Sequence, residues 1–130
     1  MAAASLTVLL VDDEEMVRTL LRRMLERLGH HVLQASNAES ALALFGHADE
    51  PIGLVISDVR LPGMSGVCLA EQLRALDASL AILLVSGAFE SESGEFAKLD
   101  KPFTFEKLEC RIGEVLGVVA GAGQLDPALG

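Results

Sequence analysis

One stretch of the chain, LVISDVRLPGMSG at residues 54–66, most constrains how this sequence can fold. It opens with an apolar, β-branched run that is typical of a strand buried on both faces of a sheet. The run stops at Asp58 and leads to Pro62-Gly63, a dipeptide that indicates a turn. Because open α/β sheets bind ligands at the carboxyl ends of their strands, Asp58 is a candidate site residue. The alternative is that Asp58 only caps the following turn.

Apolar runs of this kind alternate with amphipathic segments along the chain. Strands are predicted at residues 6–11, 31–35, 52–57, 80–85 and 96–100. Helices are predicted at residues 14–28, 37–45, 65–76 and 104–116, where apolar residues recur three and four positions apart. This alternation predicts an α/β fold in which a five-stranded parallel sheet is doubly wound, with helices on both faces. One domain is expected over residues 1–119, followed by a flexible C-terminal tail at residues 120–130.

The amino-acid composition limits the kinds of partner that the chain can bind. With 130 residues, of which 51% are hydrophobic, the chain is long enough for one folded core. Its formal net charge of −9 argues against binding to nucleic acid, which needs a basic face. The chain has neither a membrane-spanning apolar run nor a basic leader, so we expect a cytoplasmic protein without membrane association. Cys68 and Cys110 are predicted to be buried or half-buried in helices, in a reducing compartment, and not joined in a disulfide.

Polar residues follow four of the predicted strands. They are Asp12 and Asp13 after the first strand, Asp58 after the third, Ser86 after the fourth and Lys101 after the fifth. The carboxyl ends of parallel strands meet at one edge of the sheet, so these side chains should converge. Clustered carboxylates favour Mg²⁺, while a lysine and a hydroxyl can hold phosphate oxygens. The set predicts Mg²⁺-assisted phosphoryl transfer with an aspartate nucleophile. Each residue alone has an ordinary role, as part of an acidic helix start, as a turn residue or as a surface lysine, but their joint placement favours a site.

The sequence resembles the receiver domains of two-component response regulators, such as the bacterial chemotaxis regulator. The resemblance covers about residues 5–117 and rests on four ordered pieces: VLLVDDE at 8–14, the stretch at 58–66, LVSG at 84–87 and KPF at 101–103. It implies a flavodoxin-like strand order of 2-1-3-4-5. The segment at 86–104 is similar to receivers that accompany hybrid histidine kinases. The site residues that the resemblance implies are Asp58 as phosphoacceptor, Asp12, Asp13, Asp58 and the backbone carbonyl of Arg60 around Mg²⁺, and Ser86 and Lys101 on the phosphoryl group.

The implied function is that of a phosphoacceptor in a two-component phosphorelay. The domain would take a phosphoryl group from a histidine kinase or a histidine phosphotransfer protein in a Mg²⁺-dependent reaction and change its affinity for a protein partner. It would assist its own phosphorylation and dephosphorylation without being an enzyme that turns over a small substrate. One alternative is a pseudo-receiver that binds partners without phosphorylation, although such a protein is expected to lack an acid or the lysine. Another is an aspartyl phosphatase, which usually carries a second acid where this chain has Arg60.

Two features depart from the family pattern. Nine residues, 87–95, connect the fourth strand to the fifth, fewer than the dozen or so of a parallel crossover, so the fourth helix is predicted to be short or missing. Lys98 stands where many receivers carry an aromatic residue on the fifth strand. Phe96, two residues before Lys98, shares its face by strand parity, but we expect it to lie too far from Ser86 in the fold to take the place of the aromatic residue. We therefore expect phosphorylation to be retained and its conformational readout to be atypical. The side chain of Arg60 either tunes access of water to the acyl phosphate or is simply solvated.

Overall fold

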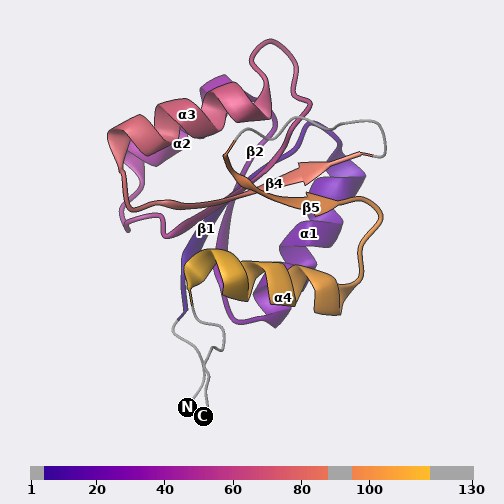
Figure 1. Ribbon diagram of the computed structural model, residues 1–130. Coiled ribbons are helices and arrows are strands. Elements are labelled where there is room, and N and C mark those ends of the chain that lie inside the picture. The colour runs from indigo at the N-terminus through magenta and orange to yellow at the C-terminus, as the bar shows by residue number, and fades with distance from the viewer. Residues whose placement is uncertain (1–4, 88–94, 118–130) are drawn as a thin grey trace.

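The computed structural model describes residues 5–87 and 95–117 (Figure 1). Within these residues the strands are β1 (Thr7–Val11), β2 (His31–Ala35), β3 (Leu54–Asp58), β4 (Ala81–Ser86) and β5 (Ala97–Asp100). The helices are α1 (Glu15–Arg27), α2 (Ala38–His47), α3 (Gly66–Leu76) and α4 (Phe105–Leu116). Every predicted element is present, and its ends differ from the prediction by at most two residues.

The strands form one parallel sheet in the order β2-β1-β3-β4-β5. This order confirms the predicted fold class, a doubly wound parallel sheet with the flavodoxin-like order 2-1-3-4-5. All neighbouring strands pair in parallel, so their carboxyl ends share one edge of the sheet. The order of the strands changes direction between β1 and β3, which is where sheets of this kind place their ligand sites.

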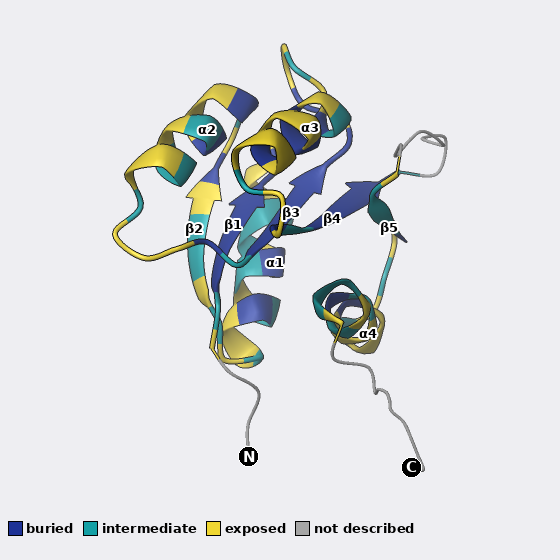
Figure 2. Cartoon of the chain, turned by 60° about the vertical axis from the view of Figure 1, so that its left-hand side comes forward, coloured by how far each residue is buried: buried dark blue, intermediate teal, exposed yellow. Residues whose placement is uncertain are grey.

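Helices cover both faces of the sheet: α2 and α3 lie on one face, and α1 and α4 on the other (Figure 2). Successive residues of a strand point to opposite faces. In β1, Leu9 and Val11 therefore join the core beneath α2 and α3, whereas Val8 and Leu10 join the core beneath α1 and α4. Because both faces are buried, the central strands must be apolar without alternation, which is the pattern seen in the sequence.

Short polar side chains fix where the helices begin. Asn37, Ser65 and Thr104 precede α2, α3 and α4, and the side-chain oxygen of each accepts a hydrogen bond from the backbone N–H three residues on. Helix α1 has no side-chain cap from its N-cap residue, Glu14. Instead, Oδ1 of Asp12 accepts a hydrogen bond from the backbone N–H of Glu14 at 2.9 Å. The start of α1 is thereby tied to the residue that follows β1.

The predicted burial of the two cysteines was wrong, because Cys68 and Cys110 are both exposed. Helical periodicity identified α3 and α4, but the buried faces of these helices are formed by other residues, such as Leu69 and Leu108. Both cysteines are free thiols, as expected.

Several predictions fall on residues that the structure does not describe. The short or missing fourth helix concerns residues 88–94, and the domain boundary at 119 and the tail at 120–130 fall within residues 118–130. Within residues 5–87 and 95–117, no helix combines the length and the apolar character that a bilayer span requires.

Candidate functional site

The carboxyl edge of the sheet brings the predicted site residues together. The register of β1 with β3 places Asp12 beside Asp58 at the ends of the two central strands. Lys101 follows β5, and its backbone N–H donates to the carbonyl of Ser86 at the end of β4, at 2.8 Å. Asp13 offers a carboxylate oxygen to the same cluster. Residues from four strand ends that are far apart in the sequence thus meet at one place.

Asp58 is the last residue of β3, and both of its carboxylate oxygens accept hydrogen bonds. The backbone N–H of Arg60 donates to Oδ1 at 3.0 Å, and Nζ of Lys101 donates to Oδ2 at 3.0 Å. The bond from Arg60 is the turn-capping contact that the sequence left open as an alternative, so Asp58 caps its turn and also belongs to the cluster. Its side chain is 9% exposed, which leaves a small opening to solvent.

Asp12 is almost completely buried, and all but one of its polar atoms have partners. Its backbone N–H donates to the carbonyl of Ala35 at 3.1 Å, and its carbonyl accepts from Nη1 of Arg18 at 2.7 Å. Oδ1 accepts from the N–H of Glu14, as described above. Oδ2 is buried without a hydrogen-bond partner, and the nearest cation, Nζ of Lys101, lies 4.0 Å away. One acceptor of the cluster is thus left for a ligand.

The surroundings of Asp12 favour its protonated form. Burial raises the pKa of Asp12 above its ordinary value of 3.8, and the negative charges of Asp58 and Asp13 raise it further. The hydrogen bond from the backbone of Glu14 and the charge of Lys101 act in the opposite direction, but the net pKa is raised. Ionisation of Asp12 therefore adds negative charge that the hydrogen bond from Glu14 and the charge of Lys101 do not fully stabilise.

Lys101 is the cation of the cluster. Burial alone lowers the pKa of Lys101, but the hydrogen bond and charge of Asp58, with the charges of Asp12 and Glu14, outweigh burial and raise the pKa above 10.5. Lys101 is therefore an ammonium ion at neutral pH, and it holds one oxygen of Asp58 in place.

Ser86 and the fifth strand complete the edge. Ser86 is fully buried at the end of β4, where its hydroxyl donates to the carbonyl of Gly87 at 3.1 Å. The register pairs Ser86 with Asp100, whose carboxylate lies 3.6 Å from Nζ of the half-buried Lys98. Phe96 precedes the other end of β5 and packs against the core beneath α2 and α3. No aromatic side chain of β5 thus lies beside Ser86 at this edge.

The comparisons with known proteins decide the family. The model of the response regulator receiver domain family matches residues 8–112 of this chain. The chain belongs to this family. The relatives of this receiver domain include both response regulators and hybrid sensor kinases.

Two relatives and one solved structure show the extent of the similarity. The transcriptional regulatory protein AruR of Pseudomonas aeruginosa is 42% identical over 83 residues, which cover 62% of this chain and 34% of AruR. The sensor kinase CckA of Brucella abortus is 32% identical over 88% of this chain but only 13% of CckA. The structure of the chemotaxis response regulator CheY4 of Vibrio cholerae superposes with a TM-score of 0.76 at 28% identity, covering 87% of this chain and all of CheY4. The chain thus spans about a third or less of the curated relatives AruR and CckA.

The acidic cluster of this receiver domain fits a small divalent cation. Asp12, Asp13 and Asp58 each offer a carboxylate oxygen, and these atoms lie within 4.8 Å of one another. The unpartnered Oδ2 of Asp12 is the acceptor that a cation would satisfy. Carboxylates and water are the ligands that Mg²⁺ prefers. The participation of the Arg60 carbonyl stays a prediction; the backbone N–H of Arg60 donates to Asp58.

Two residues that shape the site were not singled out from the sequence. Gly66 begins α3 so close to β3 that a Cβ there would overlap the carbonyl oxygen of Asp58 and approach the Cα of Val59 to 2.9 Å. A helix whose first residue is glycine, directly after a serine cap, was the available signal. Arg18 lies in the first turn of α1 and donates to Asp12. Its signal was a cation close to the positive end of a helix dipole.

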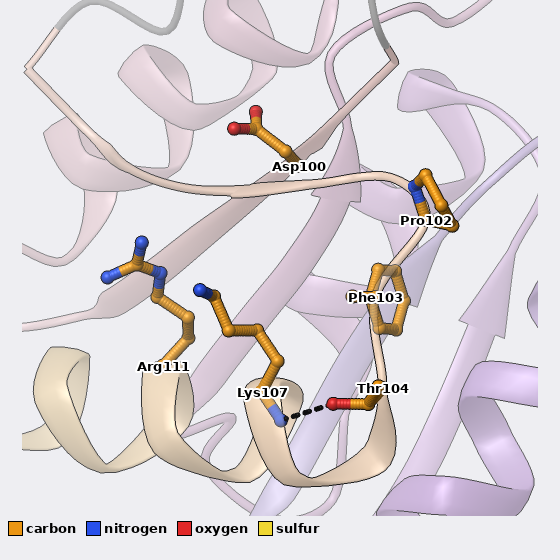
Figure 3. Close-up of a pocket in the computed structure, with 6 residues that line it drawn as sticks. All are labelled: Asp100, Pro102, Phe103, Thr104, Lys107 and Arg111. Carbon is orange, nitrogen blue, oxygen red and sulfur yellow. Dashed lines mark hydrogen bonds between the residues drawn. The ribbon is translucent and has the colours of Figure 1, made fainter.

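A hollow adjoins the edge of the sheet. It is lined by residues of the β5–α4 connection and of α4, namely Asp100, Pro102, Phe103, Thr104, Lys107 and Arg111. Figure 3 shows Lys107 and Arg111 projecting from α4 toward Asp100. Asp100 and Pro102 are the chain neighbours of Lys101, so a displacement of the Lys101 backbone would also move one wall of this hollow.

Proposed function

We propose that this receiver domain accepts a phosphoryl group on Asp58 in a two-component phosphorelay and that the acyl phosphate changes its affinity for a protein partner. The donor would be the phosphohistidine of a histidine kinase or of a histidine phosphotransfer protein. The observation that carries the proposal is the position of Asp58. Its carboxylate is held by Lys101 and by the backbone of Arg60, next to two further carboxylates that fit Mg²⁺.

The chemistry follows from these contacts. A carboxylate oxygen of Asp58 attacks phosphorus as the bond from phosphorus to the histidine nitrogen breaks, and the imidazole takes up a proton as it leaves. Lys101, now bound to Asp58 Oδ2, is placed to move onto an incoming phosphoryl oxygen, and the hydroxyl of Ser86 lies at the same edge. When bound by Asp12, Asp13 and Asp58, Mg²⁺ neutralises charge on the transferring group. The protein thus contributes positioning and charge stabilisation, which dominate catalysis of phosphoryl transfer.

The domain would act on its own phosphoryl group and not on a small-molecule substrate. Arg60, an exposed cation, stands two residues after Asp58, where an aspartyl phosphatase usually carries a second acid. The hollow is a candidate surface for the protein partner, because its lining includes Asp100 and Pro102, the chain neighbours of Lys101.

Intact-mass spectrometry after incubation with a small phosphodonor tests the proposal. The wild-type chain should gain one phosphoryl group with Mg²⁺ and none with a chelator. Asp58→Asn should remain unmodified, whereas Asp100→Asn, a matched change at the end of another strand, should behave like wild type. Failure of the wild type to react, or modification that persists in Asp58→Asn, would overturn the phosphoacceptor assignment. A wild type that stays unmodified would favour a constitutive binding module, and release of phosphate from small esters would favour the phosphatase.

A further inference from the structure

We propose that Arg18 is a positioning residue that holds the turn between β1 and α1, so that the free carboxylate oxygen of Asp12 stays aimed at the metal site. The proposal rests on the function proposed above. It assigns a role to a side chain that lies outside the acidic cluster and donates a hydrogen bond to the backbone carbonyl of Asp12.

The first support is the geometry of the turn. Nη1 of Arg18 donates to the carbonyl of Asp12 at 2.7 Å, while the N–H of Asp12 donates to Ala35 in β2 at 3.1 Å. The Asp12 peptide groups are therefore pinned on one side by the sheet and on the other by α1. Oδ1 of Asp12 is held by the N–H of Glu14, which leaves Oδ2 as the acceptor without a partner. Each of these contacts limits rotation of the carboxylate.

The second support is the placement of the charge. Arg18 lies in the first turn of α1, where the helix dipole disfavours a cation. Side chains of a helix lean toward its amino end, so the half-buried side chain of Arg18 reaches back to the residue that follows β1. Because the helix dipole disfavours the charge of Arg18 at this position, its hydrogen bond to the Asp12 carbonyl indicates a positioning role. Lysine, with a compact ammonium and a shorter reach, would hold the same carbonyl less well.

Positioning and simple electrostatics predict opposite effects on Mg²⁺ binding. Arg18 is a positive charge beside the cluster, so its removal alone would strengthen binding of a cation. If Arg18 positions Asp12, its removal lets the turn relax and weakens binding instead. The sign of the change therefore separates the two roles.

The test compares Arg18→Met with Arg22→Met. Arg22 lies one turn farther along α1, is also half-buried and pairs with Glu26 at 3.2 Å, away from the acidic cluster. Binding of Mg²⁺ alone is measured by NMR titration without any phosphodonor, and the Mg²⁺ dependence of the phosphorylation rate is measured separately. Arg18→Met should bind Mg²⁺ about tenfold more weakly, equivalent to about 1.4 kcal/mol, and Arg22→Met should bind like wild type. The rate of Arg18→Met should recover at saturating Mg²⁺, because the bound ion reorders the turn.

The remaining outcomes are decisive. Arg18→Lys keeps the charge, so an affinity between those of wild type and Arg18→Met supports positioning, and it also serves if Arg18→Met does not fold. Equal or tighter Mg²⁺ binding by the Arg18 variants, with phosphorylation at Asp58 intact in wild type, would overturn the role of Arg18 and leave the proposed function standing. A wild type that binds no Mg²⁺ would overturn both.

Discussion

Replacing Asp12 by asparagine should stabilise the metal-free protein while abolishing its response to Mg²⁺. The carboxylate of Asp12 is almost fully buried, its Oδ2 has no hydrogen-bond partner, and burial with the neighbouring acids raises its pKa. A buried charged acceptor without a hydrogen-bond partner costs about 1–3 kcal/mol. Asparagine removes that charge, keeps the oxygen that caps Glu14 and places N–H donors among the carboxylates of Asp13 and Asp58. The free energy of unfolding in a chelator should therefore rise by about 1–3 kcal/mol at pH 7, or roughly 4 °C in melting temperature per kcal/mol.

The sign of the pH dependence provides an internal check. Because the folded-state pKa of Asp12 is raised, ionisation penalises the folded wild type. The advantage of Asp12→Asn should be absent below pH 3.8, grow as the pH rises above that value and level off above the folded-state pKa. Urea denaturation across this range, with and without Mg²⁺, measures both effects. Added Mg²⁺ should stabilise the wild type and leave the variant unchanged. Asp13→Asn, a change at an exposed residue, should alter metal-free stability less. A metal-free Asp12→Asn protein that is less stable than wild type at pH 7 would refute this reasoning.

Three further changes have directions that follow from the structure. Lys101→Met should lower the free energy of unfolding by about 1 kcal/mol up to pH 10.5, and this difference should disappear as the pH rises through the raised pKa of the wild-type lysine. Urea titrations at neutral and high pH measure the difference, and equal stability of the two proteins at pH 7 would count against a role of Lys101 beside Asp58. Gly66→Ala should lower the free energy of unfolding by about 1–3 kcal/mol and slow phosphorylation, because the added Cβ meets the Asp58 carbonyl, whereas Gly46→Ala, in open space on α2, should be neutral or stabilising. Similar melting temperatures for the two variants would contradict this expectation. Burial lowers the pKa of His30, whose Nδ1 accepts a hydrogen bond at 3.2 Å from the backbone N–H just before β1. The contribution of His30 to the stability should therefore be complete above pH 6.5 and fall as the pH drops below that value, and His30→Asn, which keeps an acceptor, should remove this decline in thermal melts.

Much of the fold follows from the sequence because burial on both faces dictates composition. A strand covered by helices on each side has only apolar neighbours, so an acid at its end, such as Asp58, marks the boundary of the core. The same logic predicts that Asp12 and Lys101 lie at one edge, because parallel strands end together. The predicted start of β3 was two residues early because Ile52 is buried like a strand residue although it precedes the paired segment.

The contacts that shape the site depend on distances between side chains and backbone, which the hydrophobic periodicity of the sequence does not predict. The overlap of a Cβ at Gly66 with Asp58 depends on how closely α3 packs against the end of β3. The bond from Arg18 to Asp12 depends on the direction of one long side chain. The cysteines were misplaced for a related reason, since a small, weakly polar side chain such as that of Cys68 fits either face of a helix.

If Asp58 accepts a phosphoryl group in a site built with Mg²⁺, an NMR titration with beryllofluoride should detect binding at Asp58. Beryllofluoride is a tetrahedral anion that mimics a phosphoryl group on a carboxylate. In the wild type, the amide signals of Asp12, Asp58, Ser86 and Lys101 should shift saturably with Mg²⁺ present and not in its absence. The same titration of Asp58→Asn should leave these signals unchanged. Absence of shifts in the wild type, or identical shifts in Asp58→Asn, would show that Asp58 is not the acceptor.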